Sequence, residues 1–224
     1  MKKIILMTML MGAVFAQGDC NERAANLSGA NLAGADLGWA YLEGADLTNV
    51  NLSGAALRGV FFAGAKLSNA DLRRADLLGA SLIGADLTGA IFERTILRGT
   101  DIRGAILVKA NLTGANLGGA VLTDANLSGA DLTAAVLTDA NLSGAELSGA
   151  DLSGADLEGA VLTDANLSGA DLSGADLSGA DLSGADLEGA ILEGVRSSRI
   201  KGKPTSLPKG WSLVDGRLIK KDGE

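Results

Sequence analysis

The chain has 224 residues, of which 47% are hydrophobic and only 3% aromatic, and it carries a formal net charge of −8. It contains no histidine and one cysteine, Cys20. These counts exclude a histidine-dependent nucleophile relay, a histidine zinc site and an internal disulfide. They favour a structural or binding protein over a hydrolase.

The first residues have the composition of a secretory signal peptide. Lys2 and Lys3 precede an apolar run over residues 4–15, and small residues suited to cleavage lie close to its end. The run is shorter than the 18 or so apolar residues expected of a membrane span. We therefore predict a signal peptide over 1–16, a lead-in over 17–24, and export to the periplasm or the extracellular space with no span left after cleavage.

Two alternatives to a cleaved signal peptide remain open. The segment could be an uncleaved anchor, or the start codon could be wrongly assigned. Lipidation at Cys20 is a further alternative, but Asp19 stands where bacterial lipidation motifs need a small residue. An unpaired thiol in an exported protein is free or intermolecular, and we interpret Cys20 as an incidental residue of the lead-in.

An unbroken five-residue repeat runs from Ala25 to Gly194. It consists of 34 units of the form A-(D/N)-L-(S/T)-G. Every position whose number ends in 2 or 7 is Leu, except Phe62, Phe92 and Ile102. A helix would need apolar residues near every 3.6 positions and a plain strand would alternate throughout, so neither fits the whole run.

The spacing within one unit predicts a short strand followed by a corner. Ala and Leu lie two apart, so they point to the same side of an extended segment, and the Asp or Asn between them points away. Gly ends 24 of the 34 units and suits the third position of a type II turn. If each corner turns by about 90°, four units close a coil of about 20 residues, and coils stack at about 4.8 Å. The pattern predicts a parallel β-solenoid whose narrow axis is filled by Leu and Ala and leaves no pocket.

The run ADLSGADLSGADLSGADLEGA at residues 170–190 resembles the pentapeptide-repeat proteins. The resemblance covers about three quarters of the chain. It implies an all-β fold, a right-handed parallel quadrilateral β-helix, which we assign to residues 25–195. It also implies one candidate function, because some members present a negatively charged rod to DNA gyrase.

The C-terminal segment 196–224 is predicted to be a basic linker and a β-hairpin cap. Asp215-Gly216 lies between two apolar runs, which is a strong hairpin signal. A solenoid needs a cover at its end, where core side chains and strand edges are otherwise exposed, and we assign this cover to 204–221. The segment LPKGWSLVDGRLI also resembles a tail found after the repeats in many bacterial members. This resemblance favours the interpretation of the segment as a cap and not as a separate ligand site.

Charge is distributed unevenly along the repeat. Residues 24–109, here called the proximal half, carry eight acids and eight bases. Residues 110–195, the distal half, carry fourteen acids and no base, whereas 196–224 carry eight bases and three acids. The distal half is therefore predicted to be an acidic rod between a neutral half and a basic cap.

The twenty-residue coil predicts acidic ladders in the distal half. Asp131, Asp151 and Asp171 should stack on one face, and Asp156 and Asp176 on a second. Carboxylates about 4.8 Å apart repel by roughly 1 kcal/mol per pair in water, so the rod should be salt-sensitive. Three interpretations are open: solubility, mimicry of duplex DNA, and weak binding of divalent cations by carboxylate oxygens.

The proximal half offers two candidate contact surfaces. Tyr41 and Phe61 lie twenty apart at outward positions and should stack, with Trp39 on the adjoining side. The second surface is an arginine collar with outward isoleucines beside it, either simply solvated or a docking site for an acidic partner. In the collar Arg74 and Arg94 should stack, near Arg73, Arg98 and Arg103. The outward isoleucines beside the collar are Ile91, Ile96 and Ile106.

These patterns favour an exported, non-enzymatic structural or protein-interaction solenoid, monomeric or weakly dimeric, with an unknown protein partner. We expect no cofactor, no metal site and no nucleic acid partner. The first alternative is an acidic DNA mimic that binds a topoisomerase such as DNA gyrase in the cytoplasm. The second is a surface protein that binds divalent cations weakly.

Overall fold

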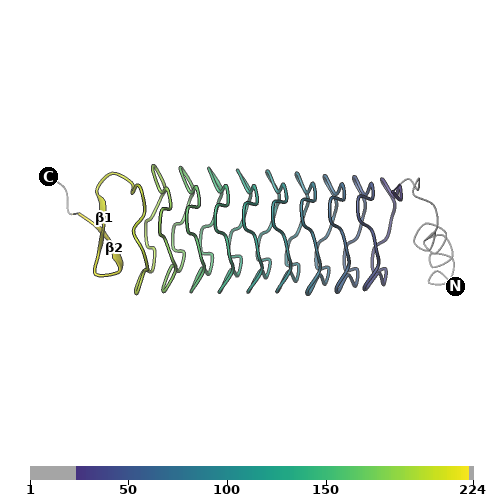
Figure 1. The fold of residues 1–224 in the computed structure, drawn as a ribbon, viewed down its shortest axis with the longest axis horizontal. Coiled ribbons are helices and arrows are strands. Elements are labelled where there is room, and N and C mark those ends of the chain that lie inside the picture. Colours follow the sequence, from purple (N-terminus) through teal and green to yellow (C-terminus); the bar gives the residue numbers. More distant parts are fainter. Residues whose placement is uncertain (1–23, 222–224) are drawn as a thin grey trace.

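The structure, a computed structural model, describes residues 24–221, which form a rod of stacked square coils closed at one end by a hairpin (Figure 1). Parallel backbone bridges join residues twenty apart, from Asn26 with Asp46 to Asp186 with Ser206. Four repeat units therefore make one coil, which confirms the parallel quadrilateral β-helix. The bridges continue to Ser206, eleven residues beyond the repeat boundary expected at 195.

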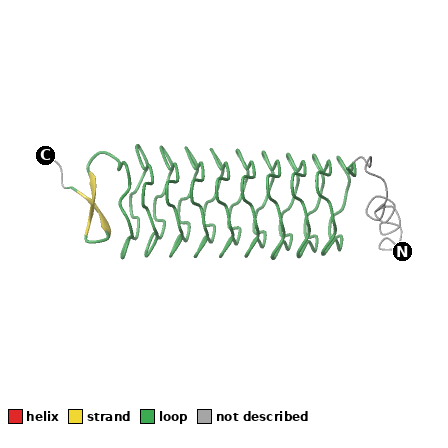
Figure 2. Ribbon diagram, viewed as in Figure 1, coloured by secondary structure: helices red, strands yellow, loops and turns green. Residues whose placement is uncertain are grey.

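Each side of a coil is a strand only one bridge long, so the solenoid appears as loop in Figure 2. The backbone is nevertheless paired on both sides. The Leu27 N–H donates to the Asp46 carbonyl at 2.7 Å, and the Asp46 N–H donates back to the Ala25 carbonyl at 2.8 Å. The corner amide of Gly29 also donates to the next coil, at the Thr48 carbonyl. Pairing of the corners as well as the sides makes the stack continuous.

Each corner is a four-residue turn, as the repeat predicts. The Ala30 N–H donates to the Leu27 carbonyl at 3.0 Å, and the third residue of this turn, Gly29, has a φ of 66°. The last residue of every one of the 34 units has a positive φ, as a type II turn requires at this position. Ten of these residues are not glycine: Trp39, Asn49, Asn69, Arg74, Arg94, Lys109, Asp124, Ala134, Asp139 and Asp164.

The outward Asp or Asn of each unit caps the corner that follows it. Asp46 Oδ1 accepts the Thr48 N–H at 3.1 Å, and Asn51 Oδ1 accepts the Ser53 N–H at 3.0 Å. The same contact recurs along the rod. Asp and Asn side chains readily form this local turn with the backbone two residues on. The repeat therefore uses Asp or Asn for turn formation as well as for solubility.

The Leu and Ala side chains fill the axis. From Ala45 to Leu187 the inward residues are at most 1% exposed, whereas Leu27 and Ala30 of the first coil are only partly buried. Thr95 and Thr100 replace Ala at two buried positions. The Thr95 hydroxyl donates to the Leu72 carbonyl at 2.7 Å, and the Thr100 hydroxyl donates to the Leu77 carbonyl at 3.1 Å. No buried side-chain polar atom within 24–221 lacks a hydrogen-bond partner.

The C-terminal hairpin consists of β1 (Trp211–Val214) and β2 (Arg217–Lys220), which pair antiparallel. The turn between them is Asp215-Gly216, as predicted. The Ile200 N–H donates to the Gly216 carbonyl at 3.0 Å, which ties the hairpin to the last coil. Several apolar side chains join it to the core: Val195, Ile200, Leu207, Trp211, Leu213 and Leu218. The expected cap is confirmed.

Alanine substitution at two corner glycines should separate backbone strain from crowding. Gly149 and Gly144 have φ values of 63° and 66°, but only at Gly144 would a Cβ meet a neighbour, Asp124 Oδ1 at 2.5 Å. We expect Gly149→Ala to lower the free energy of unfolding by about 1–2 kcal/mol through strain alone. Gly144→Ala should lower it further, because the Asp124 side chain must rotate away.

Urea denaturation followed by circular dichroism measures both losses. Adding Asp124→Gly to Gly144→Ala should remove the part of the loss caused by crowding. Equal losses for the two single variants would contradict this account of the corner.

Candidate functional site

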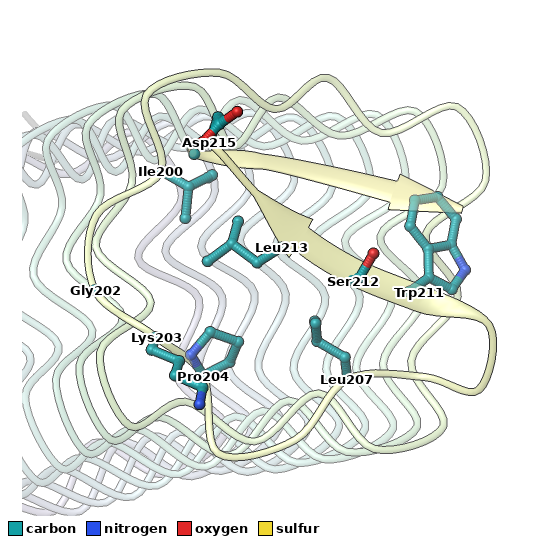
Figure 3. Close-up of a pocket in the computed structure, with 10 residues that line it drawn as sticks. Ile200, Gly202, Lys203, Pro204, Leu207, Trp211, Ser212, Leu213 and Asp215 are labelled. Atoms are coloured by element: carbon teal, nitrogen blue, oxygen red, sulfur yellow. The ribbon is translucent and has the colours of Figure 1, made fainter. Parts of the chain in front are cut away.

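A cleft of about 460 Å³ lies between the hairpin and the last coil (Figure 3). Its apolar lining includes Leu207, Trp211 and Leu213, the same residues that hold the cap on the core. Lys203 and Asp215 are its only charged lining residues. Most of the apolar lining thus already secures the cap, and the candidate sites described below lie on the outside of the rod.

Within residues 24–221 the structure contains neither a cluster of metal-ligating side chains nor a membrane-spanning helix. No three Cys, Asp or Glu side chains there come close enough to share a metal ion. Weak divalent-cation binding by the acidic ladders stays a prediction. Across the described residues, no helix has the length and apolar character needed to cross a bilayer. The proposed signal peptide at 1–16 and Cys20 lie outside the described residues.

An aromatic patch, consisting of Trp39, Tyr41 and Phe61, covers two coils of the proximal half. The Tyr41 and Phe61 rings stack with centroids 4.7 Å apart and planes 7° apart, as their spacing predicts. Trp39 is 70% exposed and Tyr41 is 64% exposed. The Trp39 indole lies against the backbone of Gly59, where an added Cβ would be 2.4 Å from the ring. Trp39 and Tyr41 are thus exposed to solvent although each ring packs on a neighbour, and Phe61 is half-buried.

An arginine patch, consisting of Arg74, Arg94, Ile96 and Arg98, occupies one side of the rod and its two corners. Arg94, Ile96 and Arg98 are successive outward residues of a single coil, and Arg74 lies one coil before Arg94. Among the described residues Arg74 and Arg98 form no ion pair within 4.0 Å, and Arg94 reaches only Glu93, at 4.0 Å. This patch therefore has guanidinium groups that are not engaged by close carboxylates.

The other arginines of the expected collar are already paired. Arg73 donates to both carboxylate oxygens of Asp71, and Arg103 does the same to Asp101, with shortest distances of 2.6 Å in each case. Arg103 also lies on a different corner of the square from Arg74, Arg94 and Arg98. The structure thus divides the collar into a paired group and the arginine patch. The sequence spacing did not distinguish the two groups.

The acidic ladders form as predicted. Asp131, Asp151 and Asp171 are bridged in succession on one face, and Asp156 is bridged to Asp176 on a second.

Basic residues that follow the repeat neutralise the end of the distal half. Arg196 Nη2 lies 3.1 Å from Asp176 Oδ2, and Lys220 Nζ lies 2.8 Å from Glu193 Oε1. Arg199 Nη2 also lies 3.8 Å from Glu158 Oε1. Within the described residues the other acids of the distal half have no ion pair within 4.0 Å.

Hydrogen bonds hold several carboxylates in the ionised form. The hydroxyl and N–H of Thr48 lower the pKa of Asp46 below its usual range. The Arg73 side chain likewise lowers the pKa of Asp71, and Arg103 lowers the pKa of Asp101. Donors directed at a carboxylate favour its charged form, so these groups stabilise the fold only while they are ionised.

A comparison with protein families finds a match to the family described as pentapeptide repeats. The match has 8 copies, over residues 25–62, 62–99, 92–124, 115–154, 125–164 and 155–194. The chain belongs to the pentapeptide-repeat family. The right-handed quadrilateral β-helix expected from the resemblance is thereby confirmed. The family match ends at residue 194, so the resemblance of the tail stays a prediction.

Solved structures of three pentapeptide-repeat proteins are similar to this one. HetL of the cyanobacterium Nostoc, described as involved in heterocyst differentiation regulation, is 37% identical over 88% of this chain and 94% of its own, with a TM-score of 0.43. Full-length QnrB1, a plasmid-mediated fluoroquinolone resistance protein, is 26% identical over 77% of this chain and 91% of its own, with a TM-score of 0.42.

The third structure is a protein of the Arabidopsis thaliana thylakoid lumen. It is 34% identical over 56% of this chain and 77% of its own, with a TM-score of 0.35. No curated protein sequence matches the chain.

Acid should destabilise the rod through the arginine-paired carboxylates. The folded-state pKa values of Asp71 and Asp101 are lowered, so their contribution to stability is present above about pH 3.9 and is lost as the pH falls further. The variant Asp71→Asn/Asp101→Asn should therefore be less stable than the unmodified protein at pH 7. It should also lose less stability between pH 5 and pH 3. Urea denaturation at each pH measures both effects.

The matched control is Asp151→Asn/Asp171→Asn, which also removes two negative charges. Asn can still accept the N–H at the corner, and the substitution removes a like-charge contact from the ladder. This control should keep or increase stability at pH 7. A loss as large as that of the arginine-paired variant would show that the ion pairs are not the cause.

Proposed function

We propose that this pentapeptide-repeat protein is an exported, non-enzymatic interaction module that binds a protein partner through the aromatic patch. The exposed rings of Trp39 and Tyr41, with half-buried Phe61 stacked on Tyr41, are the observation that carries the proposal. Trp and Tyr are over-represented among residues that contribute most to protein–protein binding. Rings that are already held in position lose little conformational freedom when a partner binds.

The architecture supports recognition by a surface. The coil axis is filled by Leu and Ala, and the cleft under the cap is lined by residues that secure the hairpin. A rigid rod presents its side chains at intervals of one coil, which suits an extended contact with a partner. The aromatic patch is the part of this surface where large rings are most exposed.

Two glycine variants test the aromatic patch while all three rings remain in the protein. Gly59→Ala places a Cβ inside the volume of the Trp39 indole, whereas Gly64→Ala, with nearly the same φ, meets nothing within 4 Å. Partner binding from the native secreted fraction should fall by tenfold or more for Gly59→Ala and for Trp39→Ala. Gly64→Ala should bind like the unmodified protein, apart from a small loss of stability.

Ile106→Ala is a further control, because Ile106 is 44% exposed and lies on another face. If Ile106→Ala reduces binding as much as Trp39→Ala does, binding through the aromatic patch is wrong. Retained binding by both Trp39→Ala and Gly59→Ala would also contradict it.

Export is the second part of the proposal and is supported by the composition of residues 1–16. Expression of the full chain in a Gram-negative host, followed by fractionation and intact-mass measurement, tests it directly. A periplasmic protein beginning near Gln17 is the expected result. An uncleaved cytosolic protein would contradict export.

The acidic ladders favour one alternative function, mimicry of duplex DNA toward a topoisomerase such as DNA gyrase. The bridged Asp131, Asp151 and Asp171 present a row of negative charge, and a basic DNA-binding surface attracts such a row. A gyrase supercoiling assay with the purified chain tests this function. Inhibition that is lost in Asp151→Asn/Asp171→Asn would favour the DNA mimic over the exported interaction module.

A further inference from the structure

The arginine patch has a geometry that the repeat spacing does not reveal. The two corner arginines of one coil extend over glycines of the next coil. A Cβ at Gly114 would lie 3.6 Å from Arg94 Cγ, and a Cβ at Gly118 would lie 3.8 Å from Arg98 Nε. The two glycines have no side chains, so the arginine side chains can lie over them. Asn116 is the outward residue between Gly114 and Gly118, and Arg94 and Arg98 therefore flank it.

Hydrogen-bond donors predominate at this place. Asn116 Oδ1 accepts the Gly118 N–H at 3.1 Å, which leaves the side-chain NH₂ group of Asn116 available as a donor. The nearest acid on the same face, Asp76, accepts Arg58 Nε at 2.5 Å. The patch therefore combines guanidinium and amide donors with two acids: Asp76, which already has its own arginine, and Glu93, whose Oε1 lies 4.0 Å from Arg94 Nε.

Exposed apolar surface lies among these donors. Ile96 is 40% exposed at the centre of the patch, and Leu78 is 40% exposed on the corner one coil before Arg98. Arginine beside apolar side chains is typical of the centre of protein–protein interfaces. A nucleic acid backbone would use the guanidinium groups but would have no counterpart for Ile96 and Leu78.

We propose that the arginine patch docks an acidic polypeptide segment that also carries an apolar side chain. Carboxylates of the segment accept from Arg94 and Arg98, with the two-pronged geometry that guanidinium groups favour, and the apolar side chain packs on Ile96. This inference rests on the proposed function only in that the partner is a protein. It uses a different surface from the aromatic patch.

The acidic distal half does not prevent this contact at physiological salt. On the corner of Arg98 the next acid is Asp139, two coils further on and roughly 10 Å away. On the face of Ile96 the next acid is Asp156, three coils further on. Both separations exceed the Debye length of about 8 Å at 0.15 M salt. The charges close to an approaching carboxylate are therefore those of the patch arginines, together with Glu93 beside Arg94.

Two double variants that have the same net charge as each other test the patch. The probe is a fluorescein-labelled, glutamate-rich peptide with one central leucine, and fluorescence anisotropy at 0.15 M salt gives its Kd. Arg94→Gln/Arg98→Gln should raise this Kd by tenfold or more. Arg73→Gln/Arg103→Gln removes the same charge from arginines that are already paired, and it should raise the Kd by less than threefold. An equal increase in Kd for the two double variants would show a general charge effect and overturn the proposal.

The apolar part of the site has its own matched pair. Ile96→Asn should raise the Kd of the probe severalfold, because the leucine loses its contact. Ile106→Asn, at an equally exposed isoleucine on another face, should leave the Kd unchanged. An unchanged Kd for Ile96→Asn would overturn the apolar contact.

Other occupants are distinguished in the same assay. A glutamine version of the peptide should not bind. If duplex DNA displaces the peptide at equal charge concentration and depends on the same arginines, the site is a general polyanion site and the proposal is wrong. Self-association in sedimentation velocity that disappears in Arg94→Gln/Arg98→Gln would assign the patch to a second copy of this chain instead.

The outcome can be separated from that of the proposed function. Trp39→Ala should leave the Kd of the acidic peptide unchanged, and Arg94→Gln/Arg98→Gln should leave capture through the aromatic patch unchanged. If the unmodified protein does not bind the peptide, the docking proposal fails while the aromatic patch keeps its own test.

Discussion

The backbone ladder between successive coils is the constraint on which the rest of this structure depends. The backbone of each coil donates hydrogen bonds to its neighbouring coils and accepts hydrogen bonds from them. The bonded residues lie about twenty positions apart and include those of the sides and of the corners. A single inserted residue would move inward side chains to the outside in the coils that follow. The unbroken repeat from Ala25 to Gly194 meets this requirement, and the cap ends the ladder with a hairpin.

The same constraint shapes the surface. A corner residue with positive φ extends its side chain along the rod, toward the corner of the next coil. This is how the Trp39 indole comes to lie on Gly59 and the Arg94 stem beside Gly114. Trp39 and Arg94 are each followed by a glycine twenty positions later, which leaves room for their side chains, whereas Arg74 is followed by Arg94. Corner geometry therefore places Trp39 and Arg94, while Tyr41, Phe61 and Ile96 lie on the sides between corners.

The outward acids have a structural role at the corners. Their presence is therefore not by itself evidence for a function that depends on negative charge. Their oxygens accept the N–H of the following corner, as in Asp46 with Thr48, and Asn does so equally well in Asn51 with Ser53. Choosing Asp in place of Asn adds charge without changing the turn. In the distal half this produces stacked carboxylates. Within the described residues the ion pairs of this half all come from the segment after the repeat, namely Arg196 with Asp176, Arg199 with Glu158 and Lys220 with Glu193.

Much of the architecture follows from spacing, because in an extended unit two residues separated by one position must face the same side. This spacing predicted the inward Leu and Ala, the corners, the coil of twenty residues and the stacking of Tyr41 on Phe61. It also predicted the acidic ladders, and the Asp215-Gly216 pair predicted the hairpin. It did not predict which arginines are free, since Arg58 reaches Asp76 in the next coil whereas Arg103 pairs within its own. Those choices depend on side-chain rotamers and on the glycines beside them, which a periodic pattern does not specify.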